Sequence, residues 1–203
     1  MFLSQKNIID FFKINAQQEN NLNRYISSLK KHNEHTNLVG KSTLSDPWKS
    51  HLLDSIQLIS YINDQKKSIV DMGTGAGIPG VVLAIMGYKN VSLVDSNGKK
   101  TKFLNLVRNS IGVNFDIYSE RIENLNNIKF DVITSRALAN LNQLIVYSQK
   151  FLKKNSVLIF LKGKTVNDEV RDAKKNWIFE LKKHQSMSDK RGSVIILKNI
   201  KKL

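Results

Sequence analysis

The sequence of 203 residues contains no cysteine, two prolines and only four histidines. Without cysteine the chain can form neither a disulfide nor a thiolate metal site, and it has no cysteine nucleophile. Because the four histidines are scattered along the chain, we also expect no metal centre. Any chemistry must therefore rest on other residue types.

Long apolar runs are missing as well. No stretch of 18 apolar residues occurs, and the segment MFLSQKNIIDFFKIN interrupts its apolar residues with Lys, Asn, Gln and Asp. This pattern is typical of neither a signal peptide nor a membrane span, so we expect a cytoplasmic protein. Hydrophobic residues still make up 41% of the chain, which is enough for one α/β domain with a buried core.

Acidic residues are scarce, since 17 of them stand against 32 basic residues, and the formal net charge is +15. Residues 150–203 alone carry 15 basic and 5 acidic side chains. A strongly basic chain indicates a polyanionic partner, and the concentration of charge in one region favours nucleic acid over an unspecific basic surface.

Apolar residues recur at three- and four-residue spacing over residues 1–35, which predicts helix. A turn follows in which Asp46 precedes Pro47, as an N-cap precedes a proline in the first helical turn. Helical spacing returns over residues 48–62. We therefore predict a helical N-terminal extension, residues 1–62.

From Ser68 onward, short apolar runs alternate with helical stretches. We predict strands at 68–73, 91–95, 114–119, 130–137, 156–163, 177–184 and 193–199. We predict helices at 79–86, 99–111, 121–125, 140–152 and 165–175, the second with Phe103, Leu104, Leu106 and Val107 facing inward. Such alternation indicates that residues 63–203 form a mostly parallel twisted sheet flanked by helices, in one compact unit with the extension. Ligands of such sheets bind at the carboxyl ends of the strands.

The segment VDMGTGAGIPGVVLAI, residues 70–85, places four glycines between a predicted strand and a predicted helix. A nucleotide-binding P-loop would need Gly-Lys-Ser/Thr at its end, whereas Gly80 is followed by valine. Counted from Gly75, the segment satisfies the dinucleotide pattern G-x-G-x-x-G, and Asp95 follows 20 residues later. An NAD-dependent oxidoreductase is therefore one candidate.

Three details favour S-adenosylmethionine as the ligand instead. Gly73 stands at the strand end and shifts the loop to Gly73, Gly75 and Gly77. Asp71 could accept hydrogen bonds from a cationic ligand group but would repel a pyrophosphate, and Pro79 lacks an N–H that a pyrophosphate would use. A ribose diol, in turn, needs a carboxylate such as Asp95.

Six segments together resemble the RsmG family, also called GidB, which comprises bacterial methyltransferases for N7 of one guanine in 16S ribosomal RNA. They are HLLDSI (51–56), the glycine segment, LVDSNGKKTKFL (93–104), ERIENL (120–125), ITSRALANL (133–141) and LKGK (161–164). The resemblance runs from about Leu38 to Leu197. It implies a class I, Rossmann-like methyltransferase fold, S-adenosylmethionine as cofactor, and 16S ribosomal RNA or the small ribosomal subunit as partner.

The resemblance also implies roles for single residues. Gly73 and Ile78 would line the cofactor pocket, Ile122 and Glu123 would flank the adenine, and Arg136 would reach the cofactor or the target side. By analogy with class I methyltransferases, Asp95 would hold the ribose. Two positions depart from the family pattern. Ile78 stands where phenylalanine is frequent, and Met72 stands where valine or leucine is usual.

Six basic residues are candidate contacts of RNA phosphates: Lys99, Lys100, Lys102, Arg108, Lys162 and Lys164. Each could instead be a solvated surface charge. His51 and Asp54 lie three residues apart on one helix face, and a structural role is the preferred interpretation for them. Guanine N7 carries a lone pair and no proton, so the reaction needs no general base. An inactive RNA-binding module on the same fold is a further alternative, and we expect a monomer.

Overall fold

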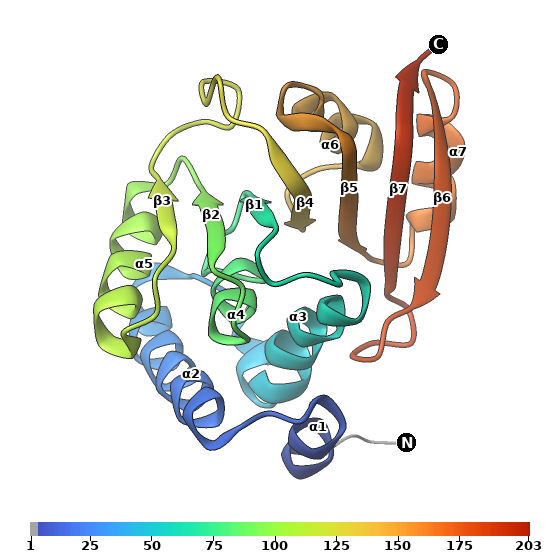
Figure 1. The fold of residues 1–203 in the computed structure, drawn as a ribbon. Coiled ribbons are helices and arrows are strands. Elements are labelled where there is room, and N and C mark those ends of the chain that lie inside the picture. The colour runs from blue at the N-terminus through green and yellow to red at the C-terminus, as the bar shows by residue number, and fades with distance from the viewer. Residues whose placement is uncertain (1–3) are drawn as a thin grey trace.

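The computed structural model describes residues 4–203 and shows seven strands in one sheet (Figure 1). The strand order is β3-β2-β1-β4-β5-β7-β6. The strands are β1 (Ser68–Met72), β2 (Asn90–Val94), β3 (Asp116–Tyr118), β4 (Phe130–Arg136), β5 (Leu152–Lys162), β6 (Trp177–Gln185) and β7 (Ser193–Lys202). All strand pairs are parallel except those of β7, which is antiparallel to both β5 and β6. The predicted mostly parallel sheet is thus confirmed.

The central strands end at the same level. Met72, the last residue of β1, pairs with Val94 at the end of β2 and with Ser135 near the end of β4. The loops after β1, β2 and β4 therefore meet at one edge of the sheet. This is the edge where parallel sheets bind their ligands.

Helices cover both faces of the sheet. The longer ones are α1 (Gln5–Phe12), α2 (Ala16–Thr36), α4 (Gly80–Ile85), α5 (Gly98–Ile111), α6 (Leu141–Ser148) and α7 (Val166–Ala173). Figure 1 shows α5 beside β3 and α7 beside the β6–β7 edge. One buried cluster joins α1, α2, α4 and α5, and a second lies under α6 and α7. None of the helices in residues 4–203 combines the length and the apolar character that crossing a bilayer requires.

The N-terminal helices form as the sequence predicts. Ser4 and Asn15 cap α1 and α2 with reciprocal side-chain bonds. The part of the helical prediction that covers Met1–Leu3 lies outside the described residues. Leu22, Tyr25 and Leu29 of α2 are fully buried in the same cluster as α4 and α5, so the N-terminal helices share the core of the sheet.

The segment after Pro47 is helical but irregular. It runs through η2 (Trp48–Leu53), a π-helix, α3 (Asp54–Ile56) and η3 (Gln57–Tyr61), a 3₁₀ helix, and it is preceded by η1 (Lys41–Leu44). Asp46 Oδ1 accepts a hydrogen bond from the Lys49 N–H at 3.1 Å, which confirms the predicted capping role of Asp46. The spacing of apolar residues does not distinguish π, α and 3₁₀ geometry in so short a run.

Three expectations about single elements are wrong. Residues 121–125 form a turn rather than a helix. Leu106 is 54% exposed instead of inward-facing, because two residues after buried Leu104 the helix has turned to its other side. The helix predicted to reach residue 152 ends at Ser148, and after the 3₁₀ turn η4 (Gln149–Phe151) β5 begins at Leu152.

Candidate active site

The glycine segment forms the loop between β1 and α4. Gly73, Gly75 and Gly77 have φ angles of 63°, 60° and 95°, a region that residues with a side chain rarely adopt. A Cβ atom at Gly77 would also lie 2.3 Å from Cγ2 of Val81. The backbone therefore needs glycine at these positions, and the predicted start of the helix at Pro79 is confirmed within one residue, since α4 begins at Gly80.

Asp71 lies beneath this loop and is fully buried. Its Oδ2 accepts hydrogen bonds from Thr74 Oγ1 at 2.5 Å and from the Gly80 N–H at 2.9 Å, and Thr134 Oγ1 lies 3.2 Å from Oδ1. The carboxylate thus ties β1, β4 and both ends of the loop together from inside. The sequence predicts a direct contact between this carboxylate and a cationic group of the ligand. That prediction is wrong, because the carboxylate is fully buried.

Asp95 follows β2 at the same edge of the sheet and is 9% exposed. Its Oδ2 accepts a hydrogen bond from the Gly75 N–H at 2.9 Å, and its Oδ1 accepts one from the Asn97 N–H at 2.8 Å. One carboxylate therefore joins the glycine loop to the start of α5. The role of Asp95 toward a ribose stays a prediction.

The structure places the other predicted cofactor residues on both faces of the sheet. Ile78 is buried in the cluster beneath α4, and Ile122 is buried on the other face, in the turn after β3. Glu123 is exposed, and its carbonyl oxygen accepts a hydrogen bond from Lys150 Nζ. Their contacts with adenine stay predictions.

Two residues near the loop were missed by sequence reasoning. The hydroxyl of Tyr25, in α2, donates to the carbonyl oxygen of Ala76 at 2.9 Å, and burial raises the pKa of this phenol. The side chain of Leu138, 38% exposed, lies over Gly73, where its Cδ1 is 2.6 Å from the position of a Cβ atom. In the sequence both residues belong to the pattern of apolar positions that predicts the core. Their position near the loop depends on tertiary packing, which no local sequence pattern indicates.

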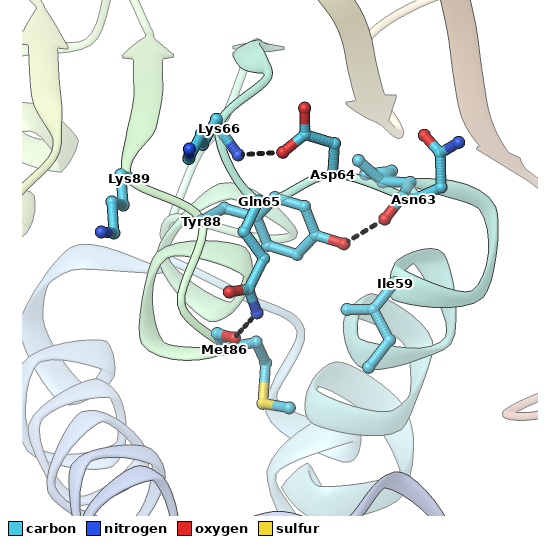
Figure 2. A pocket seen from close by; sticks show the side chains of 9 residues that line it. Ile59, Asn63, Asp64, Gln65, Lys66, Met86, Tyr88 and Lys89 are labelled. Carbon is cyan, nitrogen blue, oxygen red and sulfur yellow. Dashed lines mark hydrogen bonds between the residues drawn. The ribbon is translucent and has the colours of Figure 1, made fainter.

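A hollow of about 640 Å³ lies away from this edge, near the starts of β1 and β2 (Figure 2). Two of its polar side chains bond to the backbone. Tyr88 Oη donates to the carbonyl oxygen of Ile62 at 2.6 Å, and Gln65 Nε2 donates to that of Met86 at 3.2 Å. These bonds fasten the N-terminal helices to the α4–β2 turn, which indicates a structural region.

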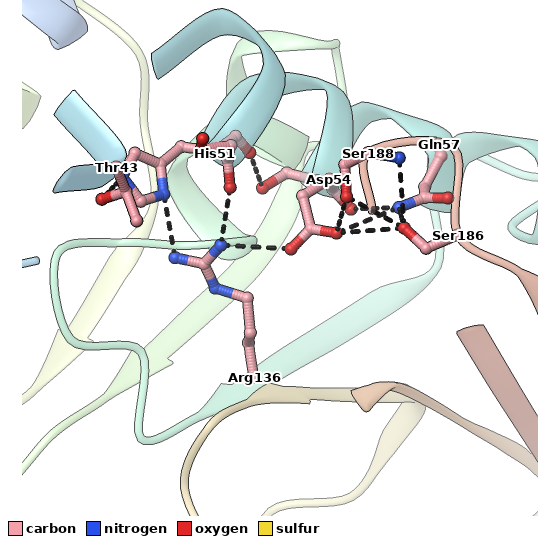
Figure 3. Close-up of polar contacts among 9 residues, drawn as sticks. Thr43, His51, Asp54, Gln57, Arg136, Ser186 and Ser188 are labelled. Atoms are coloured by element: carbon pink, nitrogen blue, oxygen red, sulfur yellow. Dashed lines mark hydrogen bonds and ion pairs between the residues drawn. The ribbon is translucent and has the colours of Figure 1, made fainter. Parts of the chain in front are cut away.

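Arg136, the last residue of β4, contacts the N-terminal helices (Figure 3). Its Nη1 donates to the Ser50 carbonyl oxygen and to Asp54 Oδ2, both at 3.1 Å, and its Nη2 lies 3.1 Å from His51 Nδ1. A guanidinium only donates, so Nδ1 of His51 accepts, and its Nε2 donates to Thr43 Oγ1 at 2.8 Å. The structural interpretation of His51 and Asp54 is supported, since both hold Arg136.

The basic residues predicted to contact RNA fall into two groups. Lys99 and Lys102 are exposed and Lys100 is half-buried at the start of α5, directly after Asp95, and Lys164 is exposed after β5. These four stay candidates.

Two of the predicted RNA contacts, Lys162 and Arg108, already have partners within the protein. Lys162 Nζ lies 2.6 Å from Glu169 Oε2, and its side chain is only 7% exposed. Arg108 donates to the Phe115 carbonyl oxygen at 3.2 Å and to Asn105 Oδ1 at 2.8 Å. It lies in the last turn of α5, about 9–14 Å along the helix from the three lysines at its start.

Two buried groups near this edge have shifted pKa values of opposite direction. Burial raises the pKa of Asp71 from 3.8 to about 6, against the effect of its hydrogen bonds. Burial, and second the charge of Arg136, lowers the pKa of His51 from 6.5 to about 4. The stability contributed by Asp71 is full below pH 3.8 and is lost as the pH rises through 6. That of His51 is full above pH 6.5 and is lost as the pH falls through 4.

In the wild type, the effects of Asp71 and His51 on the pH dependence of stability cancel each other. Asp71→Asn removes one of them, so the stability of the variant should depend on pH through His51. Asparagine fits this site, because its NH₂ can donate to Thr134 Oγ1, which lies 3.3 Å from the Val70 carbonyl oxygen and can donate onward. Between pH 7 and pH 4 the variant should lose ~3 kcal/mol of unfolding free energy relative to the wild type. Guanidinium unfolding at pH 4, 5.5 and 7 measures this, and parallel pH curves for the two proteins would contradict it.

Known proteins match the sequence of this chain over most of its length. The family model described as rRNA small subunit methyltransferase G matches residues 18–196. The ribosomal RNA small subunit methyltransferase G of Rhodospirillum rubrum is 37% identical over 174 residues, 86% of this chain and 87% of that protein. That of Orientia tsutsugamushi (strain Ikeda) is 38% identical over 195 residues, 94% of this chain and 98% of that protein.

A solved structure shows the same fold at low identity. The ribosomal protein L11 methylase of Lactobacillus delbrueckii subsp. bulgaricus superposes with a TM-score of 0.58 at 18% identity, over 74% of this chain and 77% of that one. The seven-stranded sheet flanked by helices is thus the class I methyltransferase fold. Because the family model and the relatives cover nearly the whole chain, the protein belongs to the rRNA small subunit methyltransferase G family.

Proposed function

We propose that the chain transfers a methyl group from S-adenosylmethionine to N7 of a guanine in 16S ribosomal RNA. Family membership over residues 18–196 carries the proposal, and the name of the relatives states the substrate class. The atom N7 is taken from the resemblance noted in the sequence. We expect the reaction to take place in the cytoplasm, on the RNA or on the small ribosomal subunit, with a monomeric enzyme.

The loop after β1 fits the proposed cofactor. A Cβ atom at Gly75 would meet only the Gly73 carbonyl oxygen, at 4.0 Å, so the space above this glycine is open for close approach of a ligand. Asp95 supplies carboxylate oxygens at the end of the next strand. Gly73, Gly75, Asp95, Ile122 and Glu123 would hold S-adenosylmethionine. When bound, it supplies a methyl group activated by a sulfonium.

The residues of the chain then have to position the reacting groups, because guanine N7 needs no deprotonation. Holding two reactants in line can contribute ~7–11 kcal/mol to lowering a barrier. His51 is buried, and its low pKa keeps it neutral at pH 7, which supports a role in holding Arg136. Arg136 is the candidate positioning residue toward cofactor or target.

The two alternatives are less well supported. An NAD-dependent oxidoreductase would conflict with the family to which the chain belongs. An inactive RNA-binding module would not need the glycine φ angles and the Asp95 contacts that the loop retains.

Transfer of a labelled methyl group to small-subunit ribosomal RNA, followed by mapping of the modified position, tests the proposal. We expect label on a single guanine, at N7. Absence of transfer with folded protein that binds S-adenosylmethionine would favour the inactive module. Tight NAD binding without any response to S-adenosylmethionine would favour the oxidoreductase.

Replacing Lys99, Lys100 and Lys102 together by alanine should weaken the dependence of RNA affinity on salt. Each phosphate contact contributes ~0.7–0.9 to the slope of log affinity against log salt concentration. If all three lysines contact phosphates, the slope should fall by about 2 to 3. Filter binding between 50 and 200 mM salt is a suitable measurement.

A matched variant controls for net charge. Lys6, Lys30 and Lys31 are exposed on α1 and α2, and their replacement removes the same charge. We expect this control to leave the slope nearly unchanged. If the two triple variants have equal slopes, the α5 lysines are solvated surface charges that do not contact RNA phosphates.

A further inference from the structure

A cavity of about 1040 Å³ opens beside Arg136. Its lining comes from residues 43–54 of the N-terminal region, from the ends of β4 and β5, and from residues 186–193 between β6 and β7. The volume is at the upper end of that of small-ligand sites and is ample for a nucleotide. The cavity lies at the same edge of the sheet as the glycine loop, two strands away from Asp95.

Hydrogen bonds join two walls of this cavity, the segment around Asp54 and the segment between β6 and β7 (Figure 3). We call residues 186–192 the β6–β7 loop. Ser188 Oγ donates to Asp54 Oδ1 at 2.7 Å, Gln57 Nε2 donates to Ser186 Oγ at 3.1 Å, and the Met187 N–H donates to Gln57 Oε1 at 2.9 Å. Segments more than 125 positions apart in the sequence are thus fastened together.

Asp54 connects this loop to the sheet as well. While Oδ1 accepts from Ser188, Oδ2 accepts from Arg136 at 3.1 Å. The Asp54 side chain is 15% exposed, so moving the loop away would leave a poorly hydrated carboxylate with fewer partners. The wall is therefore preformed rather than dependent on a ligand.

The charge of the lining favours a phosphate-bearing occupant. Five lining side chains are cationic and three are acidic. Asp54 and Arg136 neutralise each other at 3.1 Å, as do Asp189 and Arg191 at 3.2 Å, and Lys162 is neutralised by Glu169 at 2.6 Å. Lys49 and Lys190 then stand against Asp46, which leaves an excess of one positive charge in the lining. An enzyme that modifies a base within RNA also needs a pocket for the base after it has left its stack.

We propose that this cavity receives the target nucleotide of the RNA, and that Asp54 is a positioning residue that holds the β6–β7 loop as its wall. The inference rests on the proposed function, because it specifies where the RNA substrate of that reaction binds. It assigns the segment around Thr43 and the β6–β7 loop to the substrate side of the site.

Gly163→Phe tests the proposal by filling the cavity. No atom lies within 4 Å of a Cβ at Gly163, and its φ is not positive, so the backbone accepts a side chain without strain. Methyl transfer to RNA should fall at least about 100-fold, while calorimetric affinity for S-adenosylmethionine stays within about threefold of the wild type. Gly163→Ala, which adds only one methyl group, should lose much less activity than Gly163→Phe.

Two results would overturn the proposal: transfer by Gly163→Phe at the wild-type rate, or a loss of cofactor binding with RNA binding intact. Failure of the proposed function is distinguishable, because then the wild type itself would not methylate the RNA.

Ser188→Ala tests the positioning role without filling the cavity. It removes the 2.7 Å bond and leaves the Asp54 and Arg136 charges paired. We expect the KM for RNA to rise about fivefold to tenfold, the effect of one net hydrogen bond, with kcat and cofactor affinity unchanged.

Ser27→Ala is the control, because its hydroxyl donates to the Asn23 carbonyl oxygen within α2, outside the cavity lining. If the two serine variants have the same KM for RNA, Asp54 and the β6–β7 loop do not belong to the substrate site.

Discussion

Replacing Gly80 by alanine should lower the free energy of unfolding by about 3 kcal/mol, the upper end of the usual cost of overpacking. A Cβ atom at this position would lie 2.1 Å from Leu93 Cδ2 and 2.9 Å from Asp71 Oδ2. Both neighbours are fully buried in the central strands, and they pair with each other in the β1–β2 register. Neither side chain can move away without disturbing the sheet, so the added methyl group should strain the loop and its bond to Asp71.

Gly98→Ala is the matched control for this substitution. Gly98 begins α5, no atom lies within 4 Å of its Cβ position, and its φ is not positive. Alanine there should change stability by less than about 1 kcal/mol, in the stabilising direction, because it restricts the unfolded chain. Chemical denaturation of both variants measures the difference, and equal midpoints would show that the loop tolerates a side chain at residue 80.

The comparison of these glycines shows how far the sequence could predict the loop. A glycine run between a strand and a helix predicts positive φ angles, and Gly73, Gly75 and Gly77 have them. Gly80 is required for a different reason, since the Leu93 side chain of the neighbouring strand occupies the space beside it. That contact depends on strand register, which a local pattern does not specify.

The basic residues show the same limit. Lys162 and Lys164 are two positions apart and have the same local character, yet the first is paired with Glu169 and almost buried, while the second is exposed. The partner of Lys162 lies on the next helix, and its presence there follows from how α7 folds back onto the sheet. The residue type alone predicts a cation and not its partner.

The prediction about the role of Asp71 fails for the same reason. Its place at the end of a strand before a glycine loop was predicted, and the structure confirms it. The carboxylate turns inward because the loop offers it donors in Thr74 and Gly80, whose side-chain and backbone groups would otherwise be buried without an acceptor. The pattern predicts the position of the charge, whereas the hydrogen bonds decide its direction.

Arg136→Ala should abolish most activity while costing only part of the stability. The substitution leaves the Ser50 carbonyl oxygen, His51 Nδ1 and Asp54 Oδ2 without their shared donor. The Arg136 and Asp54 side chains are 21% and 15% exposed, so water can replace some of these bonds, and we expect a loss of about 1–3 kcal/mol. Without Arg136, Asp54 and the β6–β7 loop that it holds lose their connection to β4. Turnover on RNA should therefore fall by more than the loss of folded protein explains.

Arg136→Lys separates the charge of this residue from its shape. A lysine keeps the ion pair with Asp54 but lacks the planar fork that reaches the Ser50 carbonyl oxygen and His51 at the same time. Stability should therefore recover more than turnover does. The His51 ring gives a direct readout, because part of the lowering of its pKa comes from the charge of Arg136. In Arg136→Ala its pKa, followed by NMR, should rise from about 4, and in Arg136→Lys it should rise less. Full turnover of Arg136→Ala, with unchanged affinity for both S-adenosylmethionine and RNA, would exclude this arginine from the site and leave it only as a fastening of β4 to the N-terminal helices.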